Sequence, residues 1–335
     1  MTDRLGPEPI SARGTLVTGA SGFVGGALCR RLVRDPSWGV TEVSRGNRLY
    51  ASARHHAITR LDQATDWRGA FEAVDVVIHC AARVHFMKDD PVRALSEFRR
   101  VNVAGTETLI KAAAQAGVKR FIFLSSVKVQ GEHSMPGQPF RETDSPAPAD
   151  PYGLSKLEAE SAVRSVASAE GMEFVIIRPP LVYGPGVKAN FLSMMKWLDR
   201  GVPLPLGAIR NRRSVVALDN LVDLIVTCID HPAAANQVFL VSDGEDLSTA
   251  ELLQRMGQAL GKPARLLPIP VSLIKAGAML VGRREVAQRL CGSLRVDIRK
   301  ARELLGWEPP VGIDEAMRRT AEAFLAEVKD GQLHR

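Results

Sequence analysis

The stretch that decides the fold reads Thr15-Leu16-Val17-Thr18-Gly19-Ala20-Ser21-Gly22-Phe23-Val24-Gly25. An apolar run, typical of a buried strand, leads into three glycines spaced three residues apart and then into a helical pattern over residues 23–34. In such a turn the first glycine permits a tight bend, the second lets backbone N–H groups approach a diphosphate, and the third allows the helix to pack closely on the strand. An ordinary glycine-rich turn is the simpler alternative. We predict a dinucleotide-binding loop formed by Gly19, Gly22, Phe23, Val24 and Gly25.

Strand and helix patterns alternate through the first half of the chain. Apolar runs predict strands at residues 14–18, 40–44, 74–80, 121–125 and 174–177, and helices at 23–34, roughly 91–116 and 152–170. This alternation predicts an α/β fold, a Rossmann-type doubly wound parallel sheet covered on both faces. After residue 178 prolines and glycines cluster, and the C-terminal part is mostly helical. We expect residues 1–178 and 214–236 to form the dinucleotide-binding domain, and residues 179–213 and 237–335 a smaller, mostly helical substrate domain.

Composition and charge narrow the class of protein. The chain has 335 residues, of which 45% are hydrophobic and 24% charged, as in ordinary globular proteins. The net charge of +7 favours anionic partners, but Lys and Arg form no long run and aromatic residues make up only 5%, which argues against nucleic acid. A small ligand that carries phosphate, or a generally basic surface, accounts for the charge equally well.

Targeting and redox signals are weak. The most apolar stretch, residues 266–282, carries Lys275 and two prolines and is too short to span a bilayer, so a packed helix is expected, although the pattern also suits an interface. The first 14 residues hold no apolar run, so no secretion signal is expected. The four cysteines fit no disulfide framework, and the seven histidines form no metal set, with His55 and His56 expected in an exposed loop. We expect a cytoplasmic location and no integral membrane segment.

The end of the second predicted strand bears on the choice of cofactor. NAD enzymes place Asp or Glu there, about 20 residues after the glycines, to bind the ribose 2′-hydroxyl. This chain has Ser44-Arg45 at that point, and an arginine favours the 2′-phosphate of NADP(H). If Arg45 is only a solvated loop residue, Glu42 takes the acidic role and NAD(H) is the cofactor. Asp62 is either an adenine contact or a turn residue.

A second motif, Asp150-Pro151-Tyr152-Gly153-Leu154-Ser155-Lys156, indicates acid–base chemistry. Asp150 is a good N-cap and Pro151 a good first helical residue, which places Tyr152 and Lys156 on one helix face. A nearby ammonium, together with the positive nicotinamide ring, favours phenolate and lowers the pKa of a tyrosine, so Tyr152 can exchange a hydroxyl proton while a hydride moves. Ser126 follows an apolar strand pattern, where α/β sheets bind ligands, and its hydroxyl can hydrogen-bond the reacting oxygen. Taken alone, the Tyr–Lys spacing is equally consistent with a surface pair.

Over residues 13–325 the chain resembles the extended short-chain dehydrogenase/reductase family, in particular its sugar-nucleotide epimerases, dehydratases and ketoreductases. The resemblance rests on the glycine loop and on the Tyr152–Lys156 motif. It implies that the glycines bind the cofactor diphosphate and that Ser126, Tyr152 and Lys156 are catalytic. The further cofactor contacts that it implies are Ala81, Ala82, Asn102, Tyr152, Lys156 and Pro179.

The resemblance also implies a UDP-sugar substrate and a homodimer. Asn190 and Arg213 match positions that hold the nucleotide diphosphate, and Ser126 contacts the sugar. Simpler alternatives remain, because Asn190 is also a candidate helix cap and Arg213 a candidate surface residue.

Departures from the family pattern narrow the reaction. Dehydratases carry Asp-Glu after the catalytic hydroxyl residue, where this chain has Val127-Lys128, so dehydration is not expected. Gln130 stands where tyrosine is usual, which weakens assignment to a standard UDP-glucose epimerase. Residues 178–207 most resemble bacterial enzymes of surface-polysaccharide (O-antigen) synthesis that reduce UDP-4-keto-6-deoxy-N-acetylhexosamines at C4. We favour such a reductase, with a UDP-glucose or UDP-N-acetylglucosamine 4-epimerase as the alternative. A reductase of an apolar carbonyl compound and a non-catalytic dinucleotide sensor are the further alternatives.

Overall fold

The computed structural model describes residues 12–84, 91–280, 282 and 284–331. Its main sheet has seven strands in the order β3-β2-β1-β4-β5-β6-β9. The first five of these pair in parallel: β1 (Arg13–Thr18), β2 (Trp38–Ser44), β3 (Arg54–Ala57), β4 (Val76–His79) and β5 (Arg120–Leu124). β6 (Glu173–Arg178) and β9 (Gln237–Leu240) complete the sheet. This strand order is that of a doubly wound sheet, so the predicted Rossmann-type α/β fold is confirmed.

Contacts divide the chain into two compact units. The first unit consists of the chain up to Leu124 together with Glu158–Val175. The second unit contains Ser125–Leu157 and continues from Ile176. Helix α4 (Pro151–Glu170) begins in the second unit and ends in the first. The domain boundaries inferred from the sequence stay a prediction.

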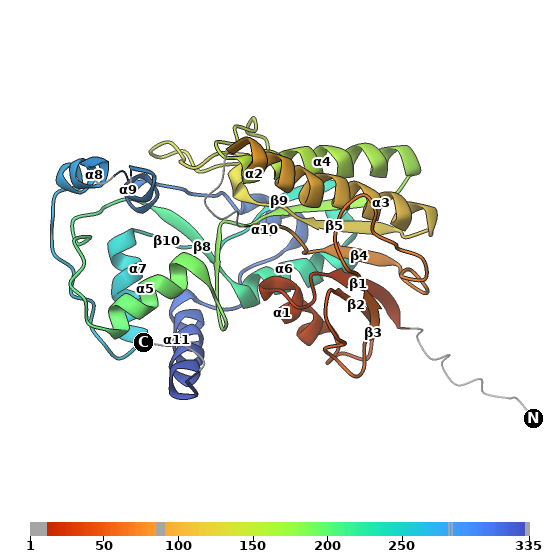
Figure 1. The fold of residues 1–335 in the computed structure, drawn as a ribbon, viewed down its shortest axis with the longest axis horizontal. Helices are drawn as coiled ribbons and strands as arrows, with labels where there is room; N and C mark the ends of the chain where they lie inside the picture. Colours follow the sequence, from red (N-terminus) through yellow and green to blue (C-terminus); the bar gives the residue numbers. More distant parts are fainter. Residues whose placement is uncertain (1–11, 85–90, 281, 283, 332–335) are drawn as a thin grey trace, which may run out of the picture. The chain divides into compact units, whose positions relative to one another are not determined.

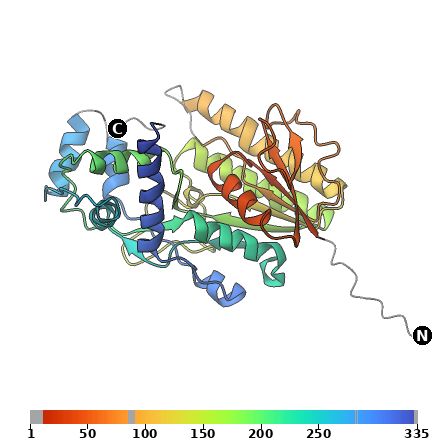
Figure 2. The same cartoon turned by 90° about the horizontal axis from the view of Figure 1, so that it is seen from below.

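In the first unit, helices lie on both faces of the strands (Figures 1 and 2). α1 (Phe23–Leu32) packs on β1 and β2, while α2 (Pro91–Phe98) and α3 (Gly105–Gln115) lie over the opposite face. Every residue of β4 is buried, as expected for an inner strand that is covered on both sides.

Two local predictions in this unit are wrong. The single helix expected over residues 91–116 is interrupted by a π-helical turn (Arg99–Ala104) between α2 and α3. His55 and His56 lie in the edge strand β3 and not in a loop, because the backbone of this segment pairs in register with β2. A strand without apolar residues gives no hydrophobic pattern from which it can be predicted.

The second unit contains a three-stranded sheet, β10-β8-β7. β7 (Leu181–Tyr183) runs parallel to β8 (Arg213–Ala217), and β10 (Asp246–Leu247) runs antiparallel to it. The helices α5 (Ala189–Asp199) and α11 (Ile313–Lys329) both contact α7 (Thr249–Ala259), and Figure 2 shows α11 beside them. The core of the unit includes Tyr183, Phe191, Leu253, Met256 and Phe324. Its other helices are α6 (Leu218–Asp230), α8 (Val271–Leu280), α9 (Arg284–Cys291) and α10 (Arg299–Leu305).

Within the described residues, none of the helices is both long enough and apolar enough to cross a bilayer.

Candidate active site

The glycine-rich turn joins β1 to α1, as predicted. Gly19 has a φ of +70°, a left-handed conformation that favours glycine. A Cβ atom on Gly25 would lie 2.3 Å from the carbonyl oxygen of Gly19, so only glycine allows α1 to approach the turn this closely. Gly22 caps α1 without a side-chain hydrogen bond, which leaves the first N–H groups of the helix for an anion. The half-buried Phe23 and Val24 form the start of this helix. The cradle fits the diphosphate of a dinucleotide.

The loop after β4 is held by polar side chains. Thr18 Oγ1 accepts a hydrogen bond from the N–H of Ala81 at 3.2 Å. The buried Asn102, in the π-helical turn, accepts from the N–H of Arg83 at 2.8 Å and donates to the carbonyl of Arg83 at 3.0 Å. Asn102 therefore positions the loop that carries Ala81 and Ala82. Direct contacts of these three residues with a cofactor stay a prediction.

The end of β2 presents an arginine, as the sequence suggested. β2 ends at the buried Ser44, and the side chain of Arg45 is exposed. Glu42 is fully buried, and its Oε1 accepts the N–H of Leu49 at 2.5 Å. One oxygen of the Glu42 carboxylate is therefore engaged by the loop that follows β2, while the buried Oε2 has no hydrogen-bond partner and Arg45 is the exposed charged group next to the strand end.

Asp62 is engaged by its own surroundings. Its buried carboxylate lies 3.0 Å from Arg100 Nη1 and 3.4 Å from Arg60 Nε. It also accepts the N–H of Ala64 at 2.9 Å, as a turn residue does. These contacts favour the turn alternative for Asp62, and the adenine contact stays a prediction.

The predicted acid–base residues come together at the start of α4. Asp150 caps the helix as expected, since its Oδ1 accepts the N–H of Gly153 at 2.6 Å. The side chain of Tyr152 hydrogen-bonds to the hydroxyl of Ser126. Lys156, one helical turn after Tyr152, is only 1% exposed. The phenol of Tyr152 is thus hydrogen-bonded to the hydroxyl of Ser126, and the buried ammonium of Lys156 lies on the same helix as Tyr152.

Three contacts that the sequence did not predict fix this arrangement. Lys128 forms an ion pair with Asp150, which ties the segment after Ser126 to the start of α4. A Cβ atom on Gly153 would lie 2.7 Å from the carbonyl oxygen of Lys128, so glycine is needed for the close approach. Val127, at the same turn, donates its N–H to the carbonyl of Pro179 at 3.0 Å. For the close approach of Gly153 to Lys128, the only signal in the sequence was the glycine that directly follows Tyr152.

The protonation of Tyr152 differs from the expectation. Burial raises the pKa of Tyr152, the carboxylate of Asp150 raises it further, and the hydrogen bond from Ser126 opposes them in part. Removal of water from the phenol dominates in the protein without cofactor, whereas the expected lowering of the pKa also needs the nicotinamide ring and stays a prediction. Tyr152 is neutral at pH 7, and the positive charge of a bound nicotinamide would be needed to favour phenolate.

Asp150→Asn should move the pH profile of the enzyme to lower pH. Asparagine keeps the helix cap but removes the charge that raises the pKa of Tyr152. If Tyr152 acts as a base, kcat/KM rises as pH passes its pKa, so the rise should come earlier in the variant. The measurement is kcat/KM against pH, with Asp144→Asn as the matched control because Asp144 caps only a local turn. A profile that does not move would contradict the influence of Asp150 on Tyr152.

Asn190 lies on a strained segment. It is the exposed second residue of α5 and follows Ala189, whose φ of +55° is left-handed. The N-cap of α5 is Lys188, so the alternative that Asn190 caps the helix is wrong. Strain of this kind in a residue other than glycine is often found at binding sites.

Arg213 begins β8 and is anchored by the backbone. It is half-buried, and its Nη1 donates to the carbonyl oxygens of Arg289 at 2.8 Å and Gly292 at 3.1 Å. Burial lowers the pKa of Arg213, with a smaller opposing effect from Glu132. An anion bound here would restore the lost stabilisation of the charge. The half-buried, anchored side chain does not fit the surface-residue alternative.

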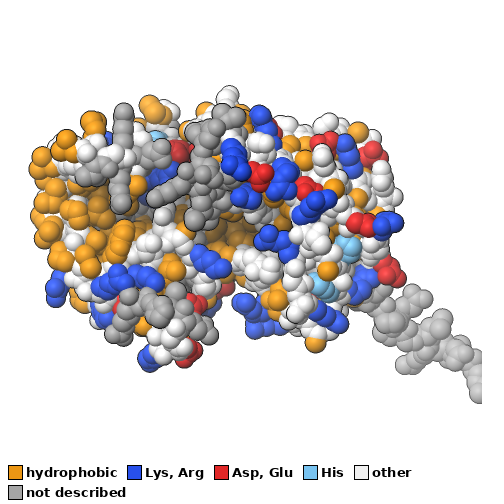
Figure 3. All heavy atoms as spheres, in the orientation of Figure 1, with side chains coloured by type: hydrophobic (Ala, Val, Ile, Leu, Met, Phe, Trp, Pro, Cys, Tyr) orange, Lys and Arg blue, Asp and Glu red, His pale blue; other side chains and the backbone are white. Residues whose placement is uncertain are grey.

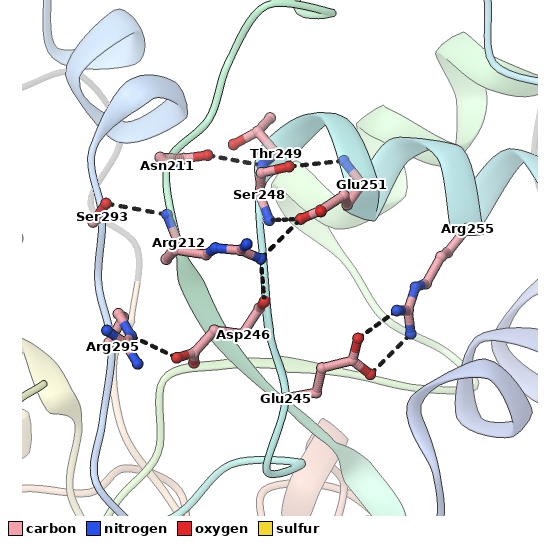
Figure 4. A network of polar contacts seen from close by, with 10 residues as sticks. All are labelled: Asn211, Arg212, Glu245, Asp246, Ser248, Thr249, Glu251, Arg255, Ser293 and Arg295. Carbon is pink, nitrogen blue, oxygen red and sulfur yellow. Dashed lines mark hydrogen bonds and ion pairs between the residues drawn. The ribbon is translucent and has the colours of Figure 1, made fainter. Parts of the chain in front are cut away.

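Figure 4 shows the polar network around Asn211 and Arg212, the two residues that precede Arg213. Arg212 Nη1 donates to the carbonyl of Asp246 at 3.2 Å and to Glu251 Oε2 at 3.3 Å. Glu251 also completes the capping box of α7. Arg295 Nε donates to Asp246 Oδ2 at 2.6 Å. Because β8 is tied to β10, α7 and the segment after α9, the direction of the Arg213 side chain is set.

This fold and site define a class of enzyme. The sequence matches the NAD dependent epimerase/dehydratase family over residues 15–242. The chain belongs to this family and is an NAD-dependent enzyme of the extended short-chain dehydrogenase/reductase type, which confirms the resemblance found in the sequence.

Among its relatives, the chain is 46% identical to a UDP-glucose 4-epimerase of Vibrio cholerae, over 96% of this chain and 97% of the relative. It is 27% identical to the N-acetyl-alpha-D-glucosaminyl-diphospho-ditrans,octacis-undecaprenol 4-epimerase of Escherichia coli O157:H7, over 94% of this chain and 96% of the relative. A solved structure of the UDP-glucose 4-epimerase of Thermotoga maritima with UDP-glucose is similar, with a TM-score of 0.76 and 25% identity over 94% of this chain and 99% of that chain.

Proposed function

We propose that the protein is a 4-epimerase of a UDP-hexose that uses NAD held by the glycine loop. The observation that carries the proposal is the hydrogen bond between Ser126 and Tyr152 at the start of α4, one turn before the buried Lys156. The similarity to UDP-glucose 4-epimerases supports C4 as the reacting carbon. This similarity favours the epimerase alternative over the C4 reductase that the sequence favoured.

The residues of this chain have distinct tasks in the reaction. NAD, when bound, supplies reversible acceptance of hydride from C4. Tyr152 takes the proton from the O4 hydroxyl and returns it, and Ser126 hydrogen-bonds the same oxygen. The 4-keto sugar has to turn its other face towards the cofactor before the hydride returns. Asn190 and Arg213 hold the diphosphate meanwhile, so that the sugar turns without leaving.

A specific observation favours the C4 reductase as a second candidate. Arg45 is exposed at the end of β2, and the buried Glu42 is engaged elsewhere. An arginine at this place suits NADPH, which cells keep reduced, and net reduction of a 4-keto sugar needs a reduced cofactor.

The carrier of the sugar is a separate question. The Escherichia coli relative is named for a sugar on undecaprenyl diphosphate. The same diphosphate contacts at Asn190 and Arg213 serve a nucleotide or a lipid carrier. The exposed apolar helix α8 favours testing the lipid carrier alongside UDP.

The purified protein, incubated with UDP-galactose and no added cofactor, should form UDP-glucose and release NAD on denaturation. Chromatography of the nucleotide sugars and of the released cofactor measures both, and UDP-N-acetylgalactosamine tests the second substrate. The Tyr152→Phe protein from the same preparation is the control. If no sugar is interconverted but NADPH is consumed with a UDP-4-keto-6-deoxyhexose, the protein is a reductase.

Arg45→Asp should weaken binding of NADPH more than binding of NADH, by at least about tenfold. The change removes one charge-assisted contact with the 2′-phosphate and adds a repulsion. Fluorescence titration of both reduced cofactors measures it, and Arg34→Asp, at an exposed position after α1, is the charge-matched control. A wild type that already binds NADH tenfold better than NADPH would show that Arg45 is a solvated residue and would remove the support for a reductase.

Arg213→Ala should raise KM for the UDP-sugar and the Kd for UDP by roughly tenfold to a hundredfold. This follows from loss of one charge-assisted contact, on the order of 1.5–3 kcal/mol. Calorimetry with UDP gives the Kd without relying on turnover. The exposed Arg210→Ala is the matched control. Unaltered binding of UDP to the Arg213 variant would exclude this residue from the diphosphate site.

A further inference from the structure

Helix α8 is unusual in exposing apolar side chains along its length. None of its ten residues is buried. Leu273, Met279 and Leu280 are 62%, 61% and 88% exposed. Only its partly buried Val271 and Ile274 pack against the core of the second unit. The helix expected here is present, but it packs on the core only through these two side chains and leaves most of its apolar residues exposed.

Neighbouring segments extend this surface. Leu267 donates its N–H to the carbonyl of Leu204 at 2.8 Å, and Val202 donates to the carbonyl of Trp197 at 3.1 Å. These bonds bring the end of α5 and the segment before α8 together. Figure 3 shows hydrophobic side chains gathered over this end of the second unit. We name the surface the apolar face; its exposed members are Trp197, Val202, Leu267, Leu273, Met279 and Leu280. Apolar surfaces of this kind mark sites of interaction.

The two segments that form the apolar face are basic. The segments 186–210 and 261–280, which form the face, contain one acidic residue, Asp199. Asp199 is buried, and its Oδ1 lies 2.5 Å from Lys262 Nζ. Figure 3 shows Lys and Arg side chains at the edge of the face. The basic residues of the two segments are Lys188, Lys196, Arg200, Arg210, Lys262, Arg265 and Lys275.

We propose that the apolar face docks on an anionic phospholipid surface, with α8 lying in the plane of the membrane interface. A lipid surface offers apolar chains beneath negatively charged headgroups, which matches apolar side chains surrounded by Lys and Arg. Trp197 at the edge suits the headgroup region, where tryptophan is enriched. A second copy of the chain fits less well, because symmetric pairing of the faces would bring the two basic rims together.

The test is sedimentation of the full chain with vesicles. Wild type should bind vesicles of phosphatidylcholine with phosphatidylglycerol, bind pure phosphatidylcholine at least about tenfold more weakly, and lose binding as salt is raised. Leu273→Ser with Leu280→Ser should weaken binding at least about tenfold. Leu304→Ser is the matched control, because Leu304 is 42% exposed on α10, outside the apolar face.

Three results would overturn the proposal. They are no binding of wild type to either vesicle, equal binding by the double variant and wild type, or a wild-type dimer in sedimentation velocity that the double variant converts to monomer. The last would show that the face joins two copies of this chain. Because vesicle binding is measured without substrate, its outcome is independent of whether the protein is an epimerase.

Discussion

Tyr152→Phe is expected to lower turnover by about 10²–10⁴-fold at saturating substrate, the usual share of general acid–base catalysis. Phenylalanine keeps the ring and removes the oxygen that hydrogen-bonds to Ser126 and that we propose exchanges a proton with O4. Binding of NAD should be nearly unchanged, because phenylalanine keeps the ring of Tyr152 and the glycine loop that we propose for the diphosphate is unaltered. The measurements are kcat for epimerisation of the UDP-sugar and the cofactor content of the purified variant.

A matched control is available in the same unit. Tyr183 is fully buried and donates its hydroxyl to Asp243 Oδ2 at 2.8 Å. Tyr183→Phe should lower the free energy of unfolding by about 1–3 kcal/mol, since a buried carboxylate loses a partner, but leave kcat within a few-fold of wild type. If Tyr152→Phe turns over at a near-normal rate, or if both variants lose activity equally, Tyr152 is not the acid–base residue.

Much of the fold could be predicted because its signals are local. β4, β5 and β6 are mostly buried apolar runs, the pattern expected of strands that are covered on both faces. β3 was not predicted because Arg54–Ala57 has no apolar pattern and is recognised as a strand only by its backbone pairing with β2. β7 is only three residues long and follows two prolines. The π-helical turn between α2 and α3 was not predicted because about one extra residue per turn barely changes the helical periodicity of the sequence.

In the candidate site, too, the local motifs could be predicted and the contacts between residues distant in the sequence could not. The glycine loop and the Tyr152–Lys156 pair are short motifs whose geometry follows from one turn or one helix. The pairing of Lys128 with Asp150 joins residues 22 positions apart, and that of Asn102 with Arg83 joins residues 19 apart. No pattern in the sequence links them. The raised pKa of Tyr152 in the protein without cofactor was not predicted for the same reason, because burial is a property of the folded chain.

Gly25→Ala is expected to weaken NAD binding at least about a hundredfold. A Cβ atom there would lie 2.3 Å from the carbonyl oxygen and 2.7 Å from the carbonyl carbon of Gly19, both of them backbone atoms that cannot turn aside. The start of α1 would have to move away from the turn. The N–H groups aimed at the diphosphate would move with it, and loss of two charge-assisted hydrogen bonds, each on the order of 1.5–3 kcal/mol, exceeds a hundredfold in affinity.

The control separates this effect from general loss of fold. A Cβ atom on Gly39 in β2 would meet its nearest neighbour at 3.8 Å, an ordinary contact, so Gly39→Ala should bind NAD as wild type does. Circular dichroism and thermal melting without cofactor show whether each variant is folded, and titration of NAD gives the Kd. A folded Gly25→Ala protein with wild-type affinity would mean that α1 does not bind the diphosphate through its first turn. The proposed hydride chemistry would then need a different binding site for the cofactor, because the start of α1 is the site that we propose for its diphosphate.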